Sequence, residues 1–245
     1  MDIKKVCLVV LLFSLLGSTA FALDMMGPPT AALDKDQFAA GFEYSYSRID
    51  VSTSGLLRSM SGIKSLDNVE SNKYYARLAY GLSDNWEIYY RLGGGDAKVD
   101  DEGVDFNGNN GFAGNVGTRV TFLKENNVSW GVLGQINWLN SDAVGTYQGG
   151  TANTNIDLQE IQLAIGPKVQ MDGWSLYGGA LYYQMDGDFD TNWAGGKASA
   201  DIDVNSDFGG YIGAHFDLGK NLSIEVESAM VGDGYSIGTG IVWKF

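Results

Sequence analysis

The stretch of sequence that decides the fold is Tyr235-Ser236-Ile237-Gly238-Thr239-Gly240-Ile241-Val242-Trp243-Lys244-Phe245. Every second side chain in it, beginning with Tyr235 and finishing with Phe245, is aromatic, aliphatic or β-branched. The residues between them are small or polar apart from Val242. An alternation with a period of two residues predicts a β-strand with one apolar face. The alternative is a soluble sandwich that ends on an edge strand, although such a protein has no need of an exposed Phe245.

The same alternation recurs along the whole chain. In residues 37–51, for example, Phe38, Phe42 and Tyr44 fall on one face and Glu43 falls on the other. Short runs of Gly, Asn, Asp and Ser separate such segments and act as turn signals. We therefore predict an all-β protein with ten antiparallel strands (eight or twelve being alternatives), over residues 37–51, 72–82, 86–95, 111–123, 128–139, 157–170, 174–185, 204–218, 222–230 and 235–245.

The connections between these strands alternate in length. Tight turns lie around Asp84, Asn126, Asp172 and Lys220. The other connections, except for the short link 231–234, are long and rich in Ser, Gly, Asn and Asp, and cover residues 52–71, 96–110, 140–156 and 186–203. This alternation predicts an up-and-down barrel with tight turns at one end and long loops at the other.

Aromatic residues collect near both ends of the predicted strands. They occupy the alternate positions that carry the apolar side chains, which we call the apolar parity. Five lie close to the tight turns or to the carboxyl end, namely Trp86, Trp130, Trp174, Trp243 and Phe245. Five lie near the long connections, namely Tyr74, Phe112, Trp138, Tyr182 and Phe208. About eight to ten residues of tilted strand separate the two belts, or roughly 20–25 Å, which is close to the apolar band of a membrane-spanning barrel.

The amino terminus has the pattern of an export signal. Lys4 and Lys5 precede an apolar run over residues 6–16, and Ala20-Phe21-Ala22 forms a cleavage site. We predict a cleaved signal peptide over residues 1–22, a short periplasmic tail over 23–36 and the barrel over 37–245. Cys7 precedes most of the apolar run, whereas the acylated cysteine of a lipoprotein follows it.

Composition excludes some classes of protein. The net charge of −14 makes nucleic acid an improbable partner. After the predicted signal, no apolar run approaches the ~20 residues that a transmembrane helix needs. The chain has 34 glycines and only 3 prolines, which is typical of tightly turned sheet.

The signal peptide, the alternation, the two belts and the terminal phenylalanine together resemble the small outer-membrane β-barrel superfamily, which includes the opacity proteins and outer-membrane-protein-A-like barrels. The resemblance covers residues 37–245. It implies a location in the bacterial outer membrane, with short periplasmic turns, long extracellular loops, and membrane lipid and lipopolysaccharide as surroundings. It also implies that the barrel-assembly machinery reads the terminal strand through Tyr235, Ile237, Thr239, Ile241, Trp243 and Phe245. Because the resemblance covers only the barrel, it does not imply the peptidoglycan-binding domain of the outer-membrane-protein-A family.

The opposite parity defines the side chains that face the barrel interior. Charges of both signs occur there, and a charge in a narrow interior needs a partner. The charged residues predicted to form this lumen network are Glu43, Arg77, Glu87, Arg91, Arg119, Glu160, Lys168, His215, Asp217, Glu225, Glu227 and Lys244. They would either fill a barrel slightly wider than an eight-stranded one or line a charged conduit for small solutes.

Nothing in the sequence predicts catalysis or a cofactor. The one histidine, His215, precedes a tight turn, at the end opposite to the catalytic rim of the ten-stranded outer-membrane proteases, and no nucleophile motif surrounds it. Asp186, Asp188 and Asp190 imitate the opening of a calcium loop, but Thr191 and Lys197 depart from that pattern. We regard them as a weak metal candidate.

The sequence leaves three functions open. We expect a non-catalytic outer-membrane barrel with a mostly filled lumen, whose acidic loops contact the environment or a surface partner. A narrow porin-like channel for small solutes or cations is the alternative, and a membrane-embedded hydrolase is the third. Fold alone does not separate the first two.

Overall fold

The computed structural model describes residues 23–53, 65–101, 104–109, 111–147, 150–232 and 234–245. No helix in this part of the chain is long and apolar enough to cross a membrane. The described residues form the strands β1 (Phe38–Thr53), β2 (Ser65–Ser83), β3 (Trp86–Asp101), β4 (Val104–Gly108), β5 (Gly111–Glu125), β6 (Val128–Tyr147), β7 (Gly150–Met171), β8 (Trp174–Trp193), β9 (Gly196–Asp217), β10 (Leu222–Val231) and β11 (Gly234–Lys244).

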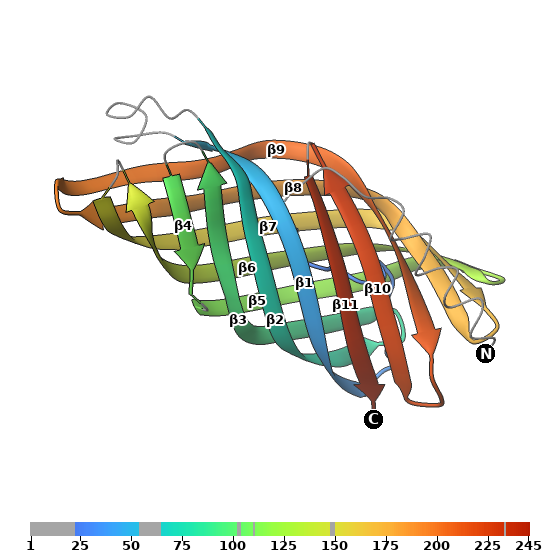
Figure 1. Cartoon of the computed structure of the whole chain (residues 1–245). Coiled ribbons are helices and arrows are strands. Elements are labelled where there is room, and N and C mark those ends of the chain that lie inside the picture. Colours follow the sequence, from blue (N-terminus) through green and yellow to red (C-terminus); the bar gives the residue numbers. More distant parts are fainter. Residues whose placement is uncertain (1–22, 54–64, 102–103, 110, 148–149, 233) are drawn as a thin grey trace.

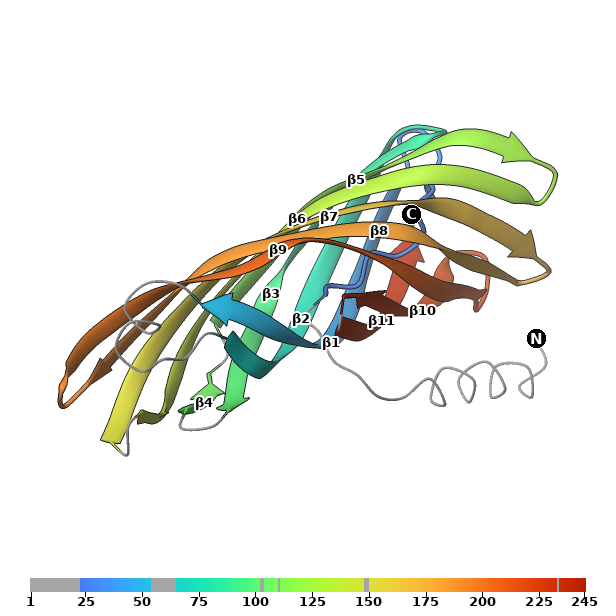
Figure 2. The same ribbon diagram turned by 90° about the horizontal axis from the view of Figure 1, so that it is seen from above.

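The ten long strands close into one antiparallel barrel (Figures 1 and 2). Each pairs with its neighbours along the chain, and β1 and β11 close the wall in an unbroken register from Ala39↔Lys244 to Arg48↔Tyr235. The short strand β4 pairs with the upper parts of β3 and β6. The all-β barrel of ten strands is therefore confirmed, with β4 as an addition to it. We call the end with the tight turns the turn end and the opposite end the hairpin end.

At the hairpin end the strands run much farther than predicted. The stretch 140–156, expected as a loop, is almost entirely a ladder between β6 and β7. The stretch 186–203 is likewise a ladder between β8 and β9, broken only by the turn at Ala194 and Gly195. The stretches 52–71 and 96–110 contain the ends of β1 and β3, the start of β2 and all of β4, and their remaining strand-free residues lie largely outside the described ones. The long-loop predictions are wrong there, because polar residues that signal turns also occupy the solvated face of an extended strand.

The first strand seals the hairpin end. The β10–β11 hairpin finishes at Val231 and Gly234, well below the tips of β8 and β9. Beyond it, β1 crosses to β9 and pairs through Ser52↔Asp203 and Thr53↔Ile202. The wall therefore stays closed above a hairpin that is too short to reach.

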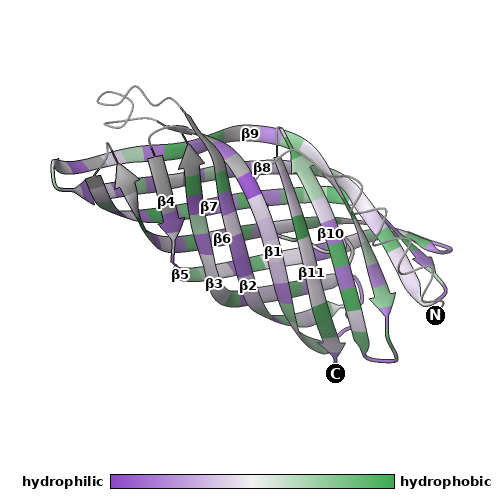
Figure 3. Cartoon of the chain, in the orientation of Figure 1, coloured by the Kyte–Doolittle hydropathy of each residue, from purple (hydrophilic) through white to green (hydrophobic). Residues whose placement is uncertain are grey.

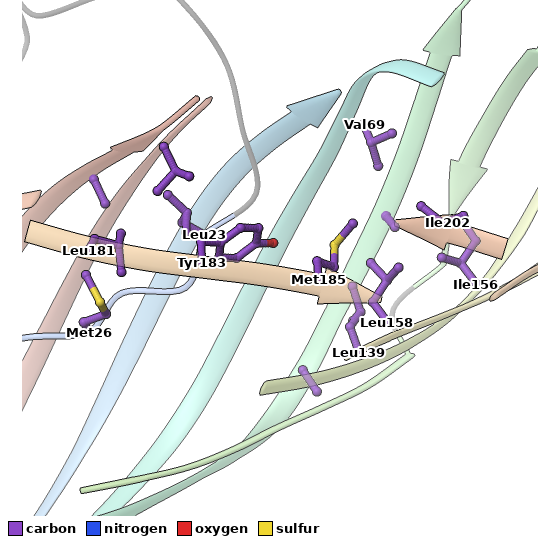
Figure 4. Close-up of a cluster of buried hydrophobic side chains, with 14 of the residues drawn as sticks. Leu23, Met26, Val69, Leu139, Ile156, Leu158, Leu181, Tyr183, Met185 and Ile202 are labelled. Carbon is purple, nitrogen blue, oxygen red and sulfur yellow. The ribbon is translucent and has the colours of Figure 1, made fainter. Parts of the chain in front are cut away.

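The interior of the hairpin end is an apolar core (Figure 4). The inward side chains of the extended strands are mostly alanine or aliphatic, so opposite walls approach closely. Those drawn in Figure 4 around this core include Val69, Leu139, Ile156, Leu158, Met185 and Ile202, each less than a tenth exposed. Buried apolar side chains therefore gather in this half of the lumen.

Aromatic residues from both predicted belts are exposed on the outer wall. Phe208, for example, is 78% exposed at the hairpin side, and Trp243 is 55% exposed at the turn side. Figure 3 shows the underlying alternation as hydrophobic and hydrophilic bands along each strand. Trp174 and Tyr182 are partly covered, because Trp174 stacks on Phe216 and Tyr182 packs edge-on against Phe208.

Pro167 lies inside β7 without ending it. Its backbone pairs with Trp130 on β6, and β7 continues to Met171. On the β8 side the ladder stops after Ile165↔Ala180 and resumes at Lys168↔Tyr177 in the same register. The missing N–H of proline therefore opens a gap in one ladder and produces no bulge.

Replacing Ile212 with arginine should lower the free energy of unfolding by about 2–4 kcal/mol, the range for a charge at the midplane of a barrel. Ile212 is 42% exposed on the outer wall and lies on β9 midway between Phe208 and Phe216. Urea unfolding of the refolded protein in lipid vesicles measures the cost. The control is Val144→Arg, because Val144 is 49% exposed but lies beyond Trp138 on β6, past the belt. Equal costs at both positions would contradict the placement of the apolar band.

Candidate functional site

The lumen at the turn end is the candidate site, and it contains the residues that the alternation placed there. Nine of the twelve predicted network residues are buried, namely Glu43, Arg77, Glu87, Arg91, Arg119, Glu160, His215, Glu225 and Glu227. Lys168 and Lys244 are half-buried and Asp217 is exposed, since all three lie close to the turn end of the barrel.

A connected set of ion pairs crosses the middle of the lumen. Arg77 lies 3.0 Å from Glu43, 3.1 Å from Glu87 and 3.3 Å from Glu225, so one guanidinium joins carboxylates from three different strands. Arg91 Nε lies 2.6 Å from the other oxygen of Glu43. Pairing of this density offsets the cost of removing the charges from water.

Tyr89 stands at the centre of this network. The guanidinium carbons of Arg77, Arg91 and Arg119 lie 5.2, 4.9 and 4.6 Å from its ring centroid, within the range of cation–π attraction. Its hydroxyl donates to Gln135 at 2.7 Å. Gly117 on β5 leaves room for the ring, because a Cβ there would lie 2.3 Å from it. We call Tyr89 and the ion pairs around it the charge layer.

Lys73 is a luminal residue that the sequence-based prediction missed. It is buried and lies 2.7 Å from Glu160 and 3.3 Å from Asp24. Tyr75 donates to the same Asp24 carboxylate at 2.9 Å. Lys73 shares the parity of Arg77 on β2, near the start of the predicted strand, so extending the luminal assignment to that end of the strand would have found it.

The amino-terminal segment 23–33 lies inside the barrel, so the prediction of a periplasmic tail is wrong for these residues. Leu23, Asp24, Met25 and Met26 are 0–2% exposed, and in Figure 4 Leu23 and Met26 lie among the luminal side chains. The segment leaves at the turn end, where the Asp36 N–H donates to Gly81 O at 2.9 Å. Nothing in its own alternation signals this location, because side chains of several strands create it.

Luminal side chains satisfy the backbone of this segment. Glu227 accepts from the N–H groups of Met26 and Gly27, both at 2.7 Å. Arg91 donates to Met25 O at 2.7 Å, and Arg119 donates to Met26 O. The carboxylate of the wall therefore accepts from backbone N–H groups of the segment, and the guanidinium groups of the wall donate to its backbone carbonyls.

The same pattern continues toward the turn end. The Ala31 N–H donates to Thr121 at 3.0 Å, and the Ala32 N–H donates to Glu87 at 2.9 Å. Lys244 donates to Ala32 O at 2.8 Å. Between these two groups of contacts lie Pro28 and Pro29, which have no N–H to satisfy.

Two carboxylates hold the imidazole of His215 in place. Its Nδ1 lies 3.1 Å from Glu225 and its Nε2 lies 3.2 Å from Asp217, so both ring nitrogens face carboxylates. Ser175 lies opposite His215 in the β8–β9 register and is buried, yet its hydroxyl makes no hydrogen bond. A general base needs a free ring nitrogen directed at the nucleophile, and neither nitrogen is free.

The weak metal candidate does not form a loop. Asp186, Asp188 and Asp190 alternate along the extended part of β8, all on its exposed face. Side chains two residues apart on a strand lie about 6.6 Å apart, too far to share one cation. Among the described residues, no group of three or more His, Cys, Asp or Glu side chains could hold a metal ion.

Comparison with known proteins adds a family and a fold. The model of the outer membrane protein beta-barrel domain matches residues 89–240, more than half of the chain. A search of curated proteins gave no match. Among solved structures, the chain is similar to the outer membrane protease OmpT from Escherichia coli, with 12% identity, a TM-score of 0.56 and coverage of 88% of this chain and 99% of that chain. It is also similar to the translocator domain of the autotransporter NalP from Neisseria meningitidis, with 11% identity, a TM-score of 0.52 and coverage of 87% and 90%. Identities this low show the barrel fold alone.

Proposed function

Because this chain belongs to the outer membrane protein β-barrel family, we propose that it is a non-catalytic surface barrel with a closed lumen. The family places it in the outer membrane. We propose that the turn end faces the periplasm, because outer-membrane barrels have short periplasmic turns and longer extracellular loops. Its task would be contact with the environment or a surface partner through the extended hairpins.

The observation that carries the proposal is that two different layers occupy the lumen. At the turn end the charge layer and residues 23–33 fill the cross-section with buried, mutually bonded groups. At the hairpin end the apolar core of inward side chains lies above them. A conducting pore needs a continuous hydrated path, which these two layers would interrupt.

The extended hairpins supply the surface for contact. Carboxylates line up across their outward face, since Asp188 pairs in register with both Asp157 and Asp201, and Asp186 pairs with Asp203. This acidic face lies just above the belt residues Phe112 and Trp138, level with lipid headgroups. Lipopolysaccharide is the first molecule that we expect it to meet, and a soluble partner for this face would carry positive charge.

A narrow channel remains the second candidate, for one specific reason. Residues 23–28 are not part of the sheet, and side-chain hydrogen bonds, the Lys73–Asp24 ion pair and apolar packing, rather than strand pairing, attach them to the wall. A segment attached in this way could move aside without breaking the barrel. A hydrolase is not proposed, because both nitrogens of His215 face carboxylates.

Planar-bilayer recording of the refolded mature protein tests the proposal. We expect no steady conductance, and at most rare brief openings, because both layers would have to open together. A known general porin in the same bilayer provides the control for insertion and sensitivity. Steady conductance comparable to that porin would contradict the closed barrel and favour the channel.

A further inference from the structure

We propose that the turn-end half of the lumen is a blind, periplasm-facing pocket that binds an extended peptide. Residues 23–33 are its ligand within the same chain, and a separate peptide of the same chemistry can replace them. This inference goes beyond the surface role proposed above and does not depend on which partner the hairpins contact.

The first support is that the wall recognises peptide backbone. Both oxygens of Glu227 accept N–H groups, at Met26 and Gly27. Arg91 and Arg119 donate to consecutive carbonyls of the segment. These contacts belong to any extended chain in this position, whatever its side chains, as in other sites that bind a peptide through its main chain.

The second support is that three positions of the ligand are specified. The Asp24 carboxylate pairs with the Lys73 ammonium group at 3.3 Å and accepts a hydrogen bond from the Tyr75 hydroxyl at 2.9 Å, so a carboxylate is required at this position. Gly27 has a φ of 77°, and a Cβ on it would lie 2.5 Å from Arg119 Nη2. A ligand therefore carries an acid three residues before a glycine, followed by residues such as Pro28 that need no N–H partner.

The third support is that the segment is separable from the barrel. Residues 23–28 take part in no strand ladder, and the closing register between β1 and β11 starts only at Ala39. If the segment withdrew, the sheet would keep its hydrogen bonds, and Lys73 and Arg91 would keep Glu160 and Glu43 as partners. Glu227, however, is buried and would lose the two N–H groups from which it accepts. A buried charge that loses its partners is costly, so the empty pocket favours a new occupant.

The pocket is blind because the apolar core of the hairpin end closes its upper side. Leu23, the deepest described residue of the segment, packs into the same cluster as Leu181 and Tyr183 (Figure 4). Withdrawal of the segment would remove Leu23 and Met26 from this cluster but leave its wall residues, such as Leu139, Ile156 and Met185, in place. A ligand therefore enters and leaves at the turn end, and the pocket does not become a channel.

The test uses the full mature chain with Gly27→Ala, which strains the backbone and forces a methyl group against Arg119. A fluorescent peptide of residues 23–34 should bind this variant, measured by anisotropy in detergent micelles, while the wild type, whose pocket is occupied, should bind at least about tenfold more weakly. The matched control is Gly173→Ala, because Gly173 has nearly the same φ of 75° but lies in the β7–β8 turn with nothing within 4 Å of a Cβ. This variant should behave as wild type.

Four further measurements make the result decisive. Adding Glu227→Gln to Gly27→Ala removes one acceptor and should weaken peptide binding roughly tenfold or more. A D24N peptide should also bind more weakly, and a scrambled peptide should not bind. A second variant, Asp24→Lys, sets a cation against Lys73 and should admit the peptide as Gly27→Ala does.

Two outcomes would overturn the inference. One is a folded barrel, judged by its heat-shifted gel mobility, that binds no peptide in either variant or binds the scrambled peptide equally well. The other is steady conductance in Gly27→Ala, which would show that the pocket is not blind. The second outcome, with a closed wild type, would leave the proposed surface barrel untouched, so the two proposals fail separately.

Discussion

Replacing Arg77 with alanine should lower the free energy of unfolding by about 3–5 kcal/mol, the cost of leaving buried charges without their partner. Arg77 is 3% exposed and pairs with Glu43, Glu87 and Glu225. Glu43 would keep Arg91 at 2.6 Å, whereas Glu87 would be left with Arg119 at the longer distance of 3.4 Å. Urea unfolding in lipid vesicles, followed by tryptophan fluorescence, measures the loss.

The control for this experiment is Arg48→Ala on the neighbouring strand β1. Arg48 and Glu70 are about one-third exposed and lie 3.9 Å apart, so their pair is worth at most about 1 kcal/mol. Equal losses for Arg77→Ala and Arg48→Ala would mean that water reaches the carboxylates around Arg77. The charge layer would then not be closed, and the channel would become the better explanation.

Deleting Phe245 should sharply reduce the amount of protein in the outer membrane. Phe245 is 69% exposed, stacks on Trp243 and donates its N–H to Phe38 O at 2.8 Å. It therefore both displays an aromatic side chain to lipid and holds the lower end of the β1–β11 seam. Quantitative blotting of outer-membrane fractions measures the loss.

The matched control for this deletion is Phe122→Ala. Phe122 is 56% exposed in β5, near the turn end, and its side chain lies on the outer wall of the barrel without contributing to the seam. It should change the amount of assembled protein little, and Phe245→Tyr should restore most of what the deletion loses. Normal assembly of the protein without Phe245 would remove the main reason for assigning residues 235–245 as the assembly signal.

The alternation of side chains predicted the membrane-spanning part of the barrel well. Period two carries the same physical meaning in every strand, so one parity placed Phe208 and Trp243 on lipid and the other placed Arg77 and Glu225 in the lumen. These assignments needed no knowledge of which strands are neighbours, because burial on one side of a sheet is a local property of each strand.

The extended hairpins could not be predicted in the same way. Beyond the apolar band the outward face of a strand meets water instead of lipid. Its outward residues are therefore often Ser, Asn and Asp, which are also the residues that signal turns. The remaining evidence for strands was the weaker inward pattern of residues such as Ala143, Ala152 and Ile156, which are small enough to escape notice.

The location of residues 23–33 lies beyond any local pattern. It depends on Lys73 from β2, Arg91 from β3, Arg119 from β5 and Glu227 from β10, which come together only when the barrel closes. Each was predicted as luminal or shares the luminal parity, yet their common ligand follows only from the assembled geometry.

Because β1 pairs with β9 above it, the short β10–β11 hairpin is not needed to close the upper barrel. The ladder that closes the upper barrel passes from Thr53 to Ile202 without using the hairpin, whose paired strands end at Val231 and Gly234. A guest sequence introduced after Val231 would therefore emerge beside the sealed barrel, at the membrane surface, without breaking a pairing that the seal requires. With the orientation proposed above, the protein would present a foreign epitope on the cell exterior without disturbing the seal between β1 and β9.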